Sequence, residues 1–452
     1  MVLLALACST PPAPAPPPPN VLLVVLDTTR ADALSAYGNA RRTSPQLDAI
    51  AEAGVRFTDV TAPAPWTWPV HASLFTGRQP WEHGAHSTVV DEAIGATGRL
   101  RMTRLDPTLP TLAERFGAAG YSTVSISANR LVVPQLGLTR GFEVGLHHET
   151  DAEVVDEALG AIQGVEGPLL LFVNLMDAHQ PWTPWPVPWQ DEQALRGDDL
   201  AGAWNDDELR LANRDASGRS FDERYTAGEL TLDDAQLAAL RGLYEGEVAK
   251  VDTSLNALIE GWQAAGRGGV IAVTSDHGEA LGEHRQIGHH HQLYDELVQV
   301  PLVLAGPGLP AGATVDTPVS LTRLHDTLLE LAGLEGPDSL SAELGGAAGR
   351  PILSAVWPDM GWTDALGAFW GQGSRLYREQ DLAVLWRDDG SRELYDLAAD
   401  PDMIRDLAAD RPDEAAALQA RGRAAFGTEA TGELLDRGED ETERLRALGY
   451  IE

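Results

Sequence analysis

The sequence predicts an α/β fold, a layered α/β/α sandwich with helices on both faces of a mainly parallel sheet and a smaller C-terminal α+β subdomain. Three uninterrupted aliphatic runs, each followed directly by an aspartate, indicate buried parallel strands. Segments of helical spacing alternate with these runs, as expected for stacked layers of helices and strands. The length of 452 residues favours one large α/β domain with an appendage.

Each of the three aliphatic runs delivers an acid to the same edge of the predicted sheet. Ligands bind just beyond the carboxyl ends of strands in open α/β sheets, so these acids are candidates for a site. Two further strands are expected over residues 121–127, which lead to Asn129, and 301–305. The three runs are 21–26 (VLLVVL) before Asp27, 169–176 (LLLFVNLM) before Asp177, and 270–275 (VIAVTS) before Asp276 and His277.

Two helices have clear start and stop signals. Residues 44–53 begin with Ser44 at the cap position and a proline behind it, which suits the first turn of a helix. Residues 233–265 carry leucines and alanines at helical spacing and stop at Gly266, a residue that readily takes the left-handed cap conformation.

The chain divides into three parts. Residues 1–19 are expected to be a lipoprotein-type signal with a proline-rich tether, and residues 20–350 the main domain. Residues 351–452 contain short strand-like pieces, DLAVLWRD and RELYDL, followed by an acidic helical tail, and are expected to form the C-terminal subdomain. The polar stretch 190–230 is interpreted as an insertion over the site or a plain surface loop.

The charge balance excludes some partners and suggests a metal ion. Acidic residues outnumber Lys and Arg by 68 to 33, which gives a net charge of -35 and argues against nucleic acid as a partner. An anionic ester substrate would also be repelled at long range, so its site needs local positive charge, which a bound divalent cation supplies.

The single cysteine, Cys8, excludes an intramolecular disulfide and a cysteine zinc site. It ends a short apolar run, MVLLALAC, and precedes the stiff spacer STPPAPAPPPPN, a pattern that resembles a bacterial lipoprotein signal. The expectation is therefore an exported protein anchored to the bacterial cell envelope by a lipid at Cys8, with no other contact with the membrane.

A candidate nucleophile lies in residues 65–84, PWTWPVHASLFTGRQPWEHG. Residues 69–75 are expected to form a helix that is capped by Gly77, so Thr67 lies at the helix N-terminus, where free N–H groups favour a bound phosphate or sulfate. A threonine hydroxyl is a poor nucleophile unless a metal or a base activates it. Asp27, Asp276 and His277 could hold that metal.

These motifs resemble those of the sulfatases, within the alkaline phosphatase superfamily. Sulfatases carry C-x-P-S-R and, after a short spacer, T-G-R, where this chain reads T-W-P-V-H and ASLFTGR. Thr67 takes the place of the modified cysteine or serine, and His71 takes the place of the arginine. Further pieces similar to the family are NVLLVVLDTTRAD, MDAHQPW, TSDHGEALGEH, GHHHQLYDELVQVPL and ELYDLAADP. The resemblance implies an alkaline-phosphatase-like fold and a metal-dependent hydrolase of sulfate or phosphate esters.

The resemblance also assigns roles to single residues. The expected ligands of one divalent metal ion are Asp27, Thr67, Asp276 and His277. The expected catalytic groups are Thr67, as the nucleophile, and His71 or His289, as the proton donor to the leaving group. The expected substrate-binding residues are Arg78, Asn129, Asp177 and His179.

The metal need not be calcium, which many sulfatases bind with a second aspartate where this chain has Thr28. With fewer carboxylates, and with His277 where the family frequently has asparagine, the set favours Mn²⁺ or Zn²⁺ and leaves Mg²⁺ and Ca²⁺ open. A second metal would need Asp177, His179 and one of His289, His290 and His291.

Thr67 favours a phosphorus ester over a sulfate ester as the substrate. The sulfatase aldehyde, formylglycine, is made by oxidising a CH₂ group, whereas the corresponding carbon of Thr67 bears a methyl, so no formylglycine is expected. Phosphodiesterases and nucleotide pyrophosphatases of the superfamily resemble this arrangement and use an unmodified metal-bound threonine. The expected substrate is a small-molecule or glycan ester; the alternatives are an aldehyde-independent sulfuric ester hydrolase and an inactive sulfatase-like binding protein.

Overall fold

The computed structural model describes residues 17–88, 101–182, 186–187, 221–289, 292–358, 366 and 369–427. The predictions about Cys8, about most of the 190–230 stretch, about His290 and His291 and about the end of the acidic tail lie outside these residues.

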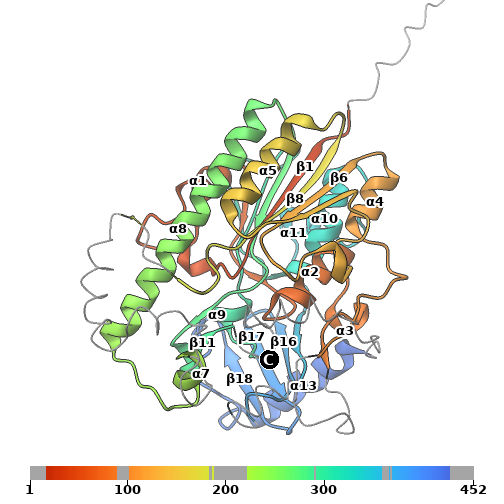
Figure 1. Ribbon diagram of the computed structural model, residues 1–452. Coiled ribbons are helices and arrows are strands. Elements are labelled where there is room, and N and C mark those ends of the chain that lie inside the picture. The colour runs from red at the N-terminus through yellow and green to blue at the C-terminus, as the bar shows by residue number, and fades with distance from the viewer. Residues whose placement is uncertain are drawn as a thin grey trace, which may run out of the picture.

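A central sheet of eight strands organises the main part of the molecule (Figure 1). Strand β12 runs antiparallel to both of its neighbours, while the remaining strands run in one direction. The order across the sheet is β13 (Ala313–Val315), β2 (Val55–Phe57), β12 (Leu302–Ala305), β9 (Gly269–Thr274), β1 (Asn20–Leu26), β8 (Leu169–Leu175), β6 (Ser122–Ser127) and β7 (Val144–His147).

The central strands confirm the aliphatic runs read from the sequence. Strand β1 lies between β9 and β8, with Val24 opposite Val273 on one side and Val173 on the other. All three strands are buried almost throughout, because helices cover both faces of the sheet. The five strands predicted from sequence are all present, within a residue or two of the expected limits.

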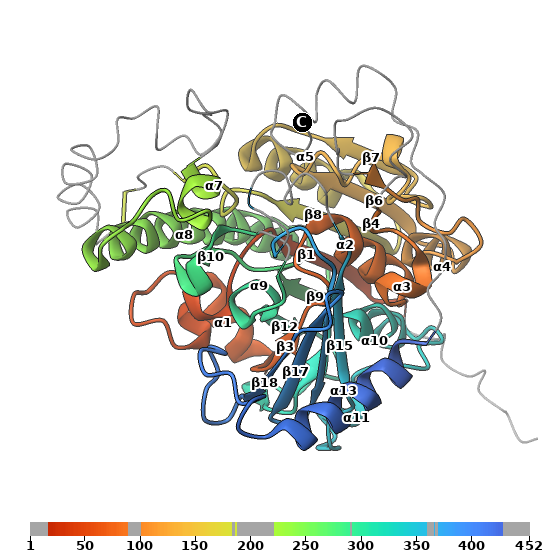
Figure 2. The same cartoon turned by 90° about the horizontal axis from the view of Figure 1, so that it is seen from below.

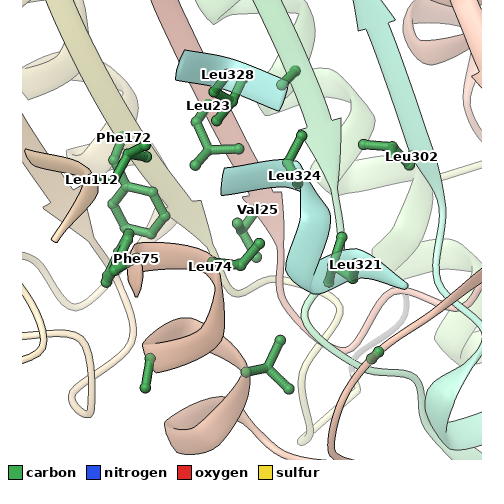
Figure 3. Close-up of a cluster of buried hydrophobic side chains, with 14 of the residues drawn as sticks. Leu23, Val25, Leu74, Phe75, Leu112, Phe172, Leu302, Leu321, Leu324 and Leu328 are labelled. Carbon is green, nitrogen blue, oxygen red and sulfur yellow. The ribbon is translucent and has the colours of Figure 1, made fainter. Parts of the chain in front are cut away.

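One helical layer contains α2 (Thr67–Thr76), α4 (Leu112–Ala118) and α10 (Leu324–Leu331). Alternate residues of β1, such as Leu23 and Val25, point into a core with Leu74 and Phe75 from α2 and Leu324 from α10 (Figure 3). The opposite face, with Leu22, Val24 and Leu26, packs on the other layer, which consists of α1 (Pro45–Ala53), α5 (Asp151–Gly164) and α8 (Asp234–Ala264).

The helix signals of the sequence are confirmed. Ser44 precedes α1, whose first residue is proline, and Asp233 caps α8 by accepting a hydrogen bond from the N–H of Gln236. Gly266 follows α8 with φ +65° and Gly77 ends α2 with the same value, so both take the left-handed conformation expected of them. None of the helices in the described part of the chain has the length and apolar character needed to cross a bilayer.

A second, antiparallel sheet lies beside the carboxyl edge of the first (Figure 2). One face of it packs on α13 (Pro412–Phe426), and the other packs on residues of the main part around α9 (Asp295–Val298). Its strands are β15 (Ile352–Val356), β16 (Ser374–Glu379), β17 (Leu382–Arg387) and β18 (Arg392–Asp396), in that order. The C-terminal α+β unit expected from the sequence is thus present.

Strand β15 is joined to the segment that leads into α2. The hydroxyl of Ser354 donates to the carbonyl of Ala62 at 2.6 Å, and the N–H of Ala355 donates to the carbonyl of Pro63 at 2.9 Å. Arg378 on β16 also forms a two-pronged ion pair with Asp59, at 2.7 and 2.5 Å.

Shorter elements connect these layers. They are β3 (Val60–Thr61), α3 (Pro80–His83), β4 (Ser87–Thr88), β5 (Arg101–Met102), α7 (Phe221–Thr226), β10 (Ala280–Leu281), β11 (Ile287–Gly288), β14 (Val319–Ser320), α11 (Ser341–Leu344), and the 3₁₀ turns η1 (Ala31–Ala33), η2 (Ser35–Tyr37), η3 (Pro134–Leu136), η4 (Glu283–Arg285) and η5 (Leu321–Arg323).

Candidate active site and metal centre

Two neighbouring parallel strands bring two carboxylates together at the centre of the sheet. Asp27 follows β1 directly, and Asp276 follows the end of β9 by two residues. Because β1 and β9 are hydrogen-bonded neighbours, both acids emerge at the same edge, and both are fully buried.

Asp27, Asp276 and His277 form a group suited to a metal ion. One ligand atom of each lies within 4.8 Å of the other two. Asp27 Oδ1 and Asp276 Oδ2 are buried and have no hydrogen-bond partner. A buried carboxylate oxygen without a partner is costly unless something such as a cation satisfies it, so these two atoms fit a metal.

The other oxygen of each carboxylate is held in place by the protein. Asp27 Oδ2 accepts hydrogen bonds from Asn129 Nδ2 at 2.7 Å and from Asn174 Nδ2 at 3.3 Å. Asp276 Oδ1 accepts from the main-chain N–H groups of Thr28 at 3.2 Å and His277 at 2.9 Å. Each acid is thereby oriented through one oxygen and presents the other to the site.

The electrostatics of the group also fit a cation. Burial and the nearby charge of Asp27 raise the pKa of Asp276 well above its usual value, because two buried carboxylates repel each other. Burial, followed by the proximity of His289, lowers the pKa of His277 well below its usual range. Nδ1 of His277 lies 2.9 Å from the carbonyl of Gly278, so a neutral ring that donates there presents an unprotonated Nε2 to the metal.

Thr67 lies beside this group as the first residue of α2. Its hydroxyl Oγ1 is 3.5 Å from His277 Nε2 and accepts a hydrogen bond from Asn129 Nδ2 at 3.2 Å. The preceding residue, Trp66, provides no side-chain cap to the helix. A helix N-terminus favours an anion that approaches Thr67, and since Pro69 has no N–H, the main-chain donors of the first turn come from Thr67 and Trp68.

His71 lies one helical turn after Thr67 and is fully buried. Its Nδ1 is 3.0 Å from the carbonyl of Thr67 and 3.6 Å from Asp276 Oδ2, and its ring contacts the rings of Phe75 and Phe172. Burial lowers its pKa to about 4, so the ring is neutral at neutral pH. This placement suits a supporting role below Thr67 and Asp276 better than proton donation to a leaving group.

His289 and His179 border the metal group on another side. The ring centroid of His289 lies 4.6 Å from that of His277 and 5.0 Å from that of His179. Nδ1 of His289 is 3.1 Å from Oε1 of the fully buried Glu279. Burial, followed by the proximity of His289, lowers the pKa of His179. The structure thus brings both histidines to the group that holds Thr67.

For two residues expected to bind substrate, Asp177 and Arg78, the structure shows contacts other than with the metal group. The carboxylate of Asp177 is engaged by Lys250 Nζ of α8 at 2.7 Å. Arg78 is exposed and follows the C-terminal cap of α2, a helix of 10 residues and therefore about 15 Å long, with Thr67 at its other end. The helix therefore separates the backbone of Arg78 from that of Thr67, and a contact of Arg78 with substrate stays a prediction.

Asn174 was missed by sequence reasoning. It lies on β8, is fully buried and donates to Asp27. The available signal was one amide inside an otherwise aliphatic run, LLLFVNLM, where a buried polar group needs a partner.

A second set of metal ligands, which the sequence left open, is not found among the described residues, which do not include His290 and His291. Across the described ranges, the group of Asp27, Asp276 and His277 is the single cluster of acids and histidines with ligand spacing. Asp177, the acid that the expected second site requires, pairs with Lys250 instead.

Comparison with known proteins shows similarity to sulfatases over most of the chain. The sulfatase family model matches residues 19–334. A sulfatase of Formosa agariphila is 22% identical over 430 residues, which cover 84% of this chain and 81% of that protein. A Δ4,5-hexuronate-2-O-sulfatase of Bacteroides thetaiotaomicron is also 22% identical, with 86% of this chain and 85% of that protein covered.

Among solved structures, the phosphonate monoester hydrolase of Agrobacterium radiobacter has the same fold, with a TM-score of 0.68 and 21% identity. The alignment covers 90% of this chain and 96% of that chain. Because the family model spans more than half of the chain, this protein belongs to the sulfatase family and is an ester-hydrolysing enzyme with a candidate metal site at Asp27, Asp276 and His277.

Proposed function

We propose that the enzyme hydrolyses singly charged phosphorus esters, such as phosphodiesters or phosphonate monoesters, with Thr67 as the nucleophile. The observation that carries this proposal is the placement of Thr67 Oγ1 at a helix N-terminus, 3.5 Å from His277 Nε2 in the candidate metal group. Formation and hydrolysis of a threonine ester of phosphorus needs no modification of the side chain.

The nucleophile is prepared by its neighbours. A divalent ion bound by Asp27, Thr67, Asp276 and His277 would favour the alkoxide of Thr67 and offset charge on the transferred group. Asn129 donates one hydrogen bond to Thr67 Oγ1, which strengthens as negative charge develops there. Thr67 is the first residue of α2, and a helix N-terminus suits the oxygens of the transferred group.

His289 is the better candidate for proton donor. It borders the metal group, and Glu279 at 3.1 Å from Nδ1 fixes the orientation of its ring. In the proposed reaction Nε2–H of His289 gives its proton to the leaving-group oxygen, while His179 contacts the substrate from the adjacent loop. His71 supports the main chain at Thr67.

The charge of the site favours a substrate with one negative charge. The hydrogen bonds and ion pairs found in the described part of the chain join no arginine or lysine to Asp27, Thr67, Asp276 or His277. The charges of the two carboxylates and a divalent ion sum to about zero. A phosphate monoester carries two negative charges, and no positive side chain at the metal group would offset the second one.

A sulfuric ester hydrolase that works without the aldehyde is the second candidate, because the relatives compared above include a sugar 2-O-sulfatase. The similarity to a phosphonate monoester hydrolase is compatible with the proposed hydrolysis of phosphorus esters.

A hydrolysis panel tests the proposal. Aryl sulfate, phosphate monoester, phosphodiester and phosphonate monoester are compared with Mn²⁺, Zn²⁺, Mg²⁺ or Ca²⁺ added, using wild type and Thr67→Ala. We expect the diester and the phosphonate to be turned over fastest, and Thr67→Ala to lose activity while retaining bound metal. Full activity of Thr67→Ala, or turnover of sulfate alone, would refute the proposal.

We also propose export and lipid attachment at Cys8, on the sequence pattern alone. Expression in bacteria with a radiolabelled fatty acid should label the wild type and leave Cys8→Ser unlabelled; equal labelling of both would contradict the proposal.

A further inference from the structure

The loop that carries His179 is held by charged residues of α5 and α8 that are buried or partly buried. This loop follows β8, and a hydrogen bond from the N–H of His179 to the carbonyl of Met176, at 2.8 Å, closes it into a turn. Its position decides where the His179 ring stands relative to His289.

Asp151, the first residue of α5, fixes the start of this loop. Its Oδ1 accepts from the N–H of Met176 at 2.7 Å, and its Oδ2 accepts from the N–H of Asp177 at 2.9 Å. Asp151 is only 2% exposed, so water competes little with these bonds.

Lys250 ties the same loop to α8. Its Nζ lies 2.7 Å from Asp177 Oδ1 and 3.4 Å from Glu247 Oε2, one turn earlier on the helix. Lys250 is the only lysine in the chain. The side chains of Glu247 and Asp177 are 3% and 18% exposed and that of Lys250 is 31% exposed, so the pairs are partly buried and less screened than fully solvated surface pairs.

The two contacts act on consecutive residues of the chain. Asp151 binds the main chain at Met176 and Asp177, and Lys250 binds the side chain of Asp177. Burial and the charge of Asp177 raise the pKa of Asp151 to about 8, so the two acids lie close enough to influence each other. The ammonium of Lys250 offsets the charge that they share.

We propose that Lys250, Asp177 and Asp151 are positioning residues that hold the loop after β8 so that His179 faces His289. None of the three contacts the reacting atoms; they act through His179. The inference rests on the proposed function for its kinetic consequence, but the position of His179 can be measured separately.

The first measurement concerns structure and does not depend on turnover. The Cε1–H resonance of His179, assigned by its loss in His179→Ala, is compared in wild type, Lys250→Met and Thr253→Ala. Thr253 is an exposed residue on the same helix that bonds only to Ala249 in α8, so its variant is the matched control. We expect Lys250→Met to shift the His179 resonance and Thr253→Ala to leave it in place.

The second measurement is a double-mutant cycle. We expect Lys250→Met to lower kcat/KM about 10- to 100-fold, as a misplaced contact group does, and Lys250→Arg to recover most of the loss. In the His179→Ala background the same substitution should cost less than about twofold, because its effect acts through the missing ring.

Each outcome decides a separate question. An unmoved His179 resonance in Lys250→Met, or equal losses with and without His179, overturns the positioning role. If the wild type hydrolyses no ester in the panel, the proposed function of the site fails, and the resonance alone then decides whether Lys250 positions His179. A variant Asp151→Asn, which exchanges one of the two accepting oxygens for a donor, provides an independent test of the loop.

Discussion

Replacing Asn129 with alanine removes a side chain that donates hydrogen bonds to both the proposed nucleophile and a metal ligand. Nδ2 of Asn129 donates to Asp27 Oδ2 at 2.7 Å and to Thr67 Oγ1 at 3.2 Å. The second bond gains strength when Thr67 becomes an alkoxide, so its loss should act mainly on the transition state.

The magnitude follows from similar donors in other enzymes. Removal of one donor to a developing oxyanion costs about 100- to 1000-fold in kcat, or about 2.7 to 4 kcal/mol. Asp27 keeps one donor, Asn174 at 3.3 Å, so the metal group should survive. We therefore expect a large fall in kcat, little change in KM and nearly normal metal content.

The matched control is Asn174→Ala. Asn174 bonds to Asp27, and no hydrogen bond joins it to Thr67. Asp27 keeps the shorter bond from Asn129, at 2.7 Å, in this variant, so metal binding should change no more than in Asn129→Ala, and kcat should stay close to that of the wild type. The assay is steady-state hydrolysis of an aryl phosphodiester across metal concentrations, with bound metal measured by elemental analysis. Equal kcat losses in the two variants at saturating metal, or an unchanged kcat in Asn129→Ala, would refute the reasoning.

Three further predictions concern stability. Both ring nitrogens of His284 face acceptors, Glu296 Oε1 at 2.8 Å and the Met403 carbonyl at 3.0 Å, so the ring must carry two protons to satisfy both. Burial lowers the pKa of His284, but the contact with Glu296 raises it more, so the pKa lies above 6.5 in the folded state. The stabilisation of the folded state by the charged ring should therefore be complete below about pH 6.5 and disappear as pH rises through the folded-state pKa. Urea unfolding of wild type and His284→Gln should therefore differ most at low pH, and a difference that grows with pH would contradict this. Phe75→Ala should lower the free energy of unfolding by about 3 to 5 kcal/mol, because Phe75 is 1% exposed and packs on Phe142 and Phe172; a loss below about 1 kcal/mol by urea titration would mean that the core rearranges. A divalent ion at about 100 times its Kd should stabilise the wild type by about 2.7 kcal/mol and raise Tm, and Asp276→Asn should lose most of that response; an equal response would place the ion elsewhere.

The central sheet could be read from the sequence because buried parallel strands carry a continuous aliphatic signal. The acids at the ends of β1 and β9 were placed correctly for the same reason, since the carboxyl ends of neighbouring parallel strands share one edge. The position of Thr67 followed from the cap glycine and proline of its helix, which are local signals.

Other side-chain placements depend on interactions between distant parts of the chain, which the sequence does not report locally. The sequence places Asp177 at a strand end, but its orientation depends on Lys250, 73 residues away, which takes the carboxylate to α8. Arg78 follows the motif closely, yet the intervening helix carries it away from Thr67. The contact between Glu279 and His289 forms only when the loop after β9 folds back, which no local pattern reports.

The junction at β15 limits how this enzyme can be divided or recombined. The hydrogen bonds from Ser354 and Ala355 reach the carbonyls of Ala62 and Pro63, a few residues before the nucleophile. A recombinant catalytic fragment that ends at residue 350 would leave that approach segment without its neighbouring strand. Chimeras between members of the family should therefore take β15 and the segment before α2 from the same parent, although the two stretches lie far apart in the gene.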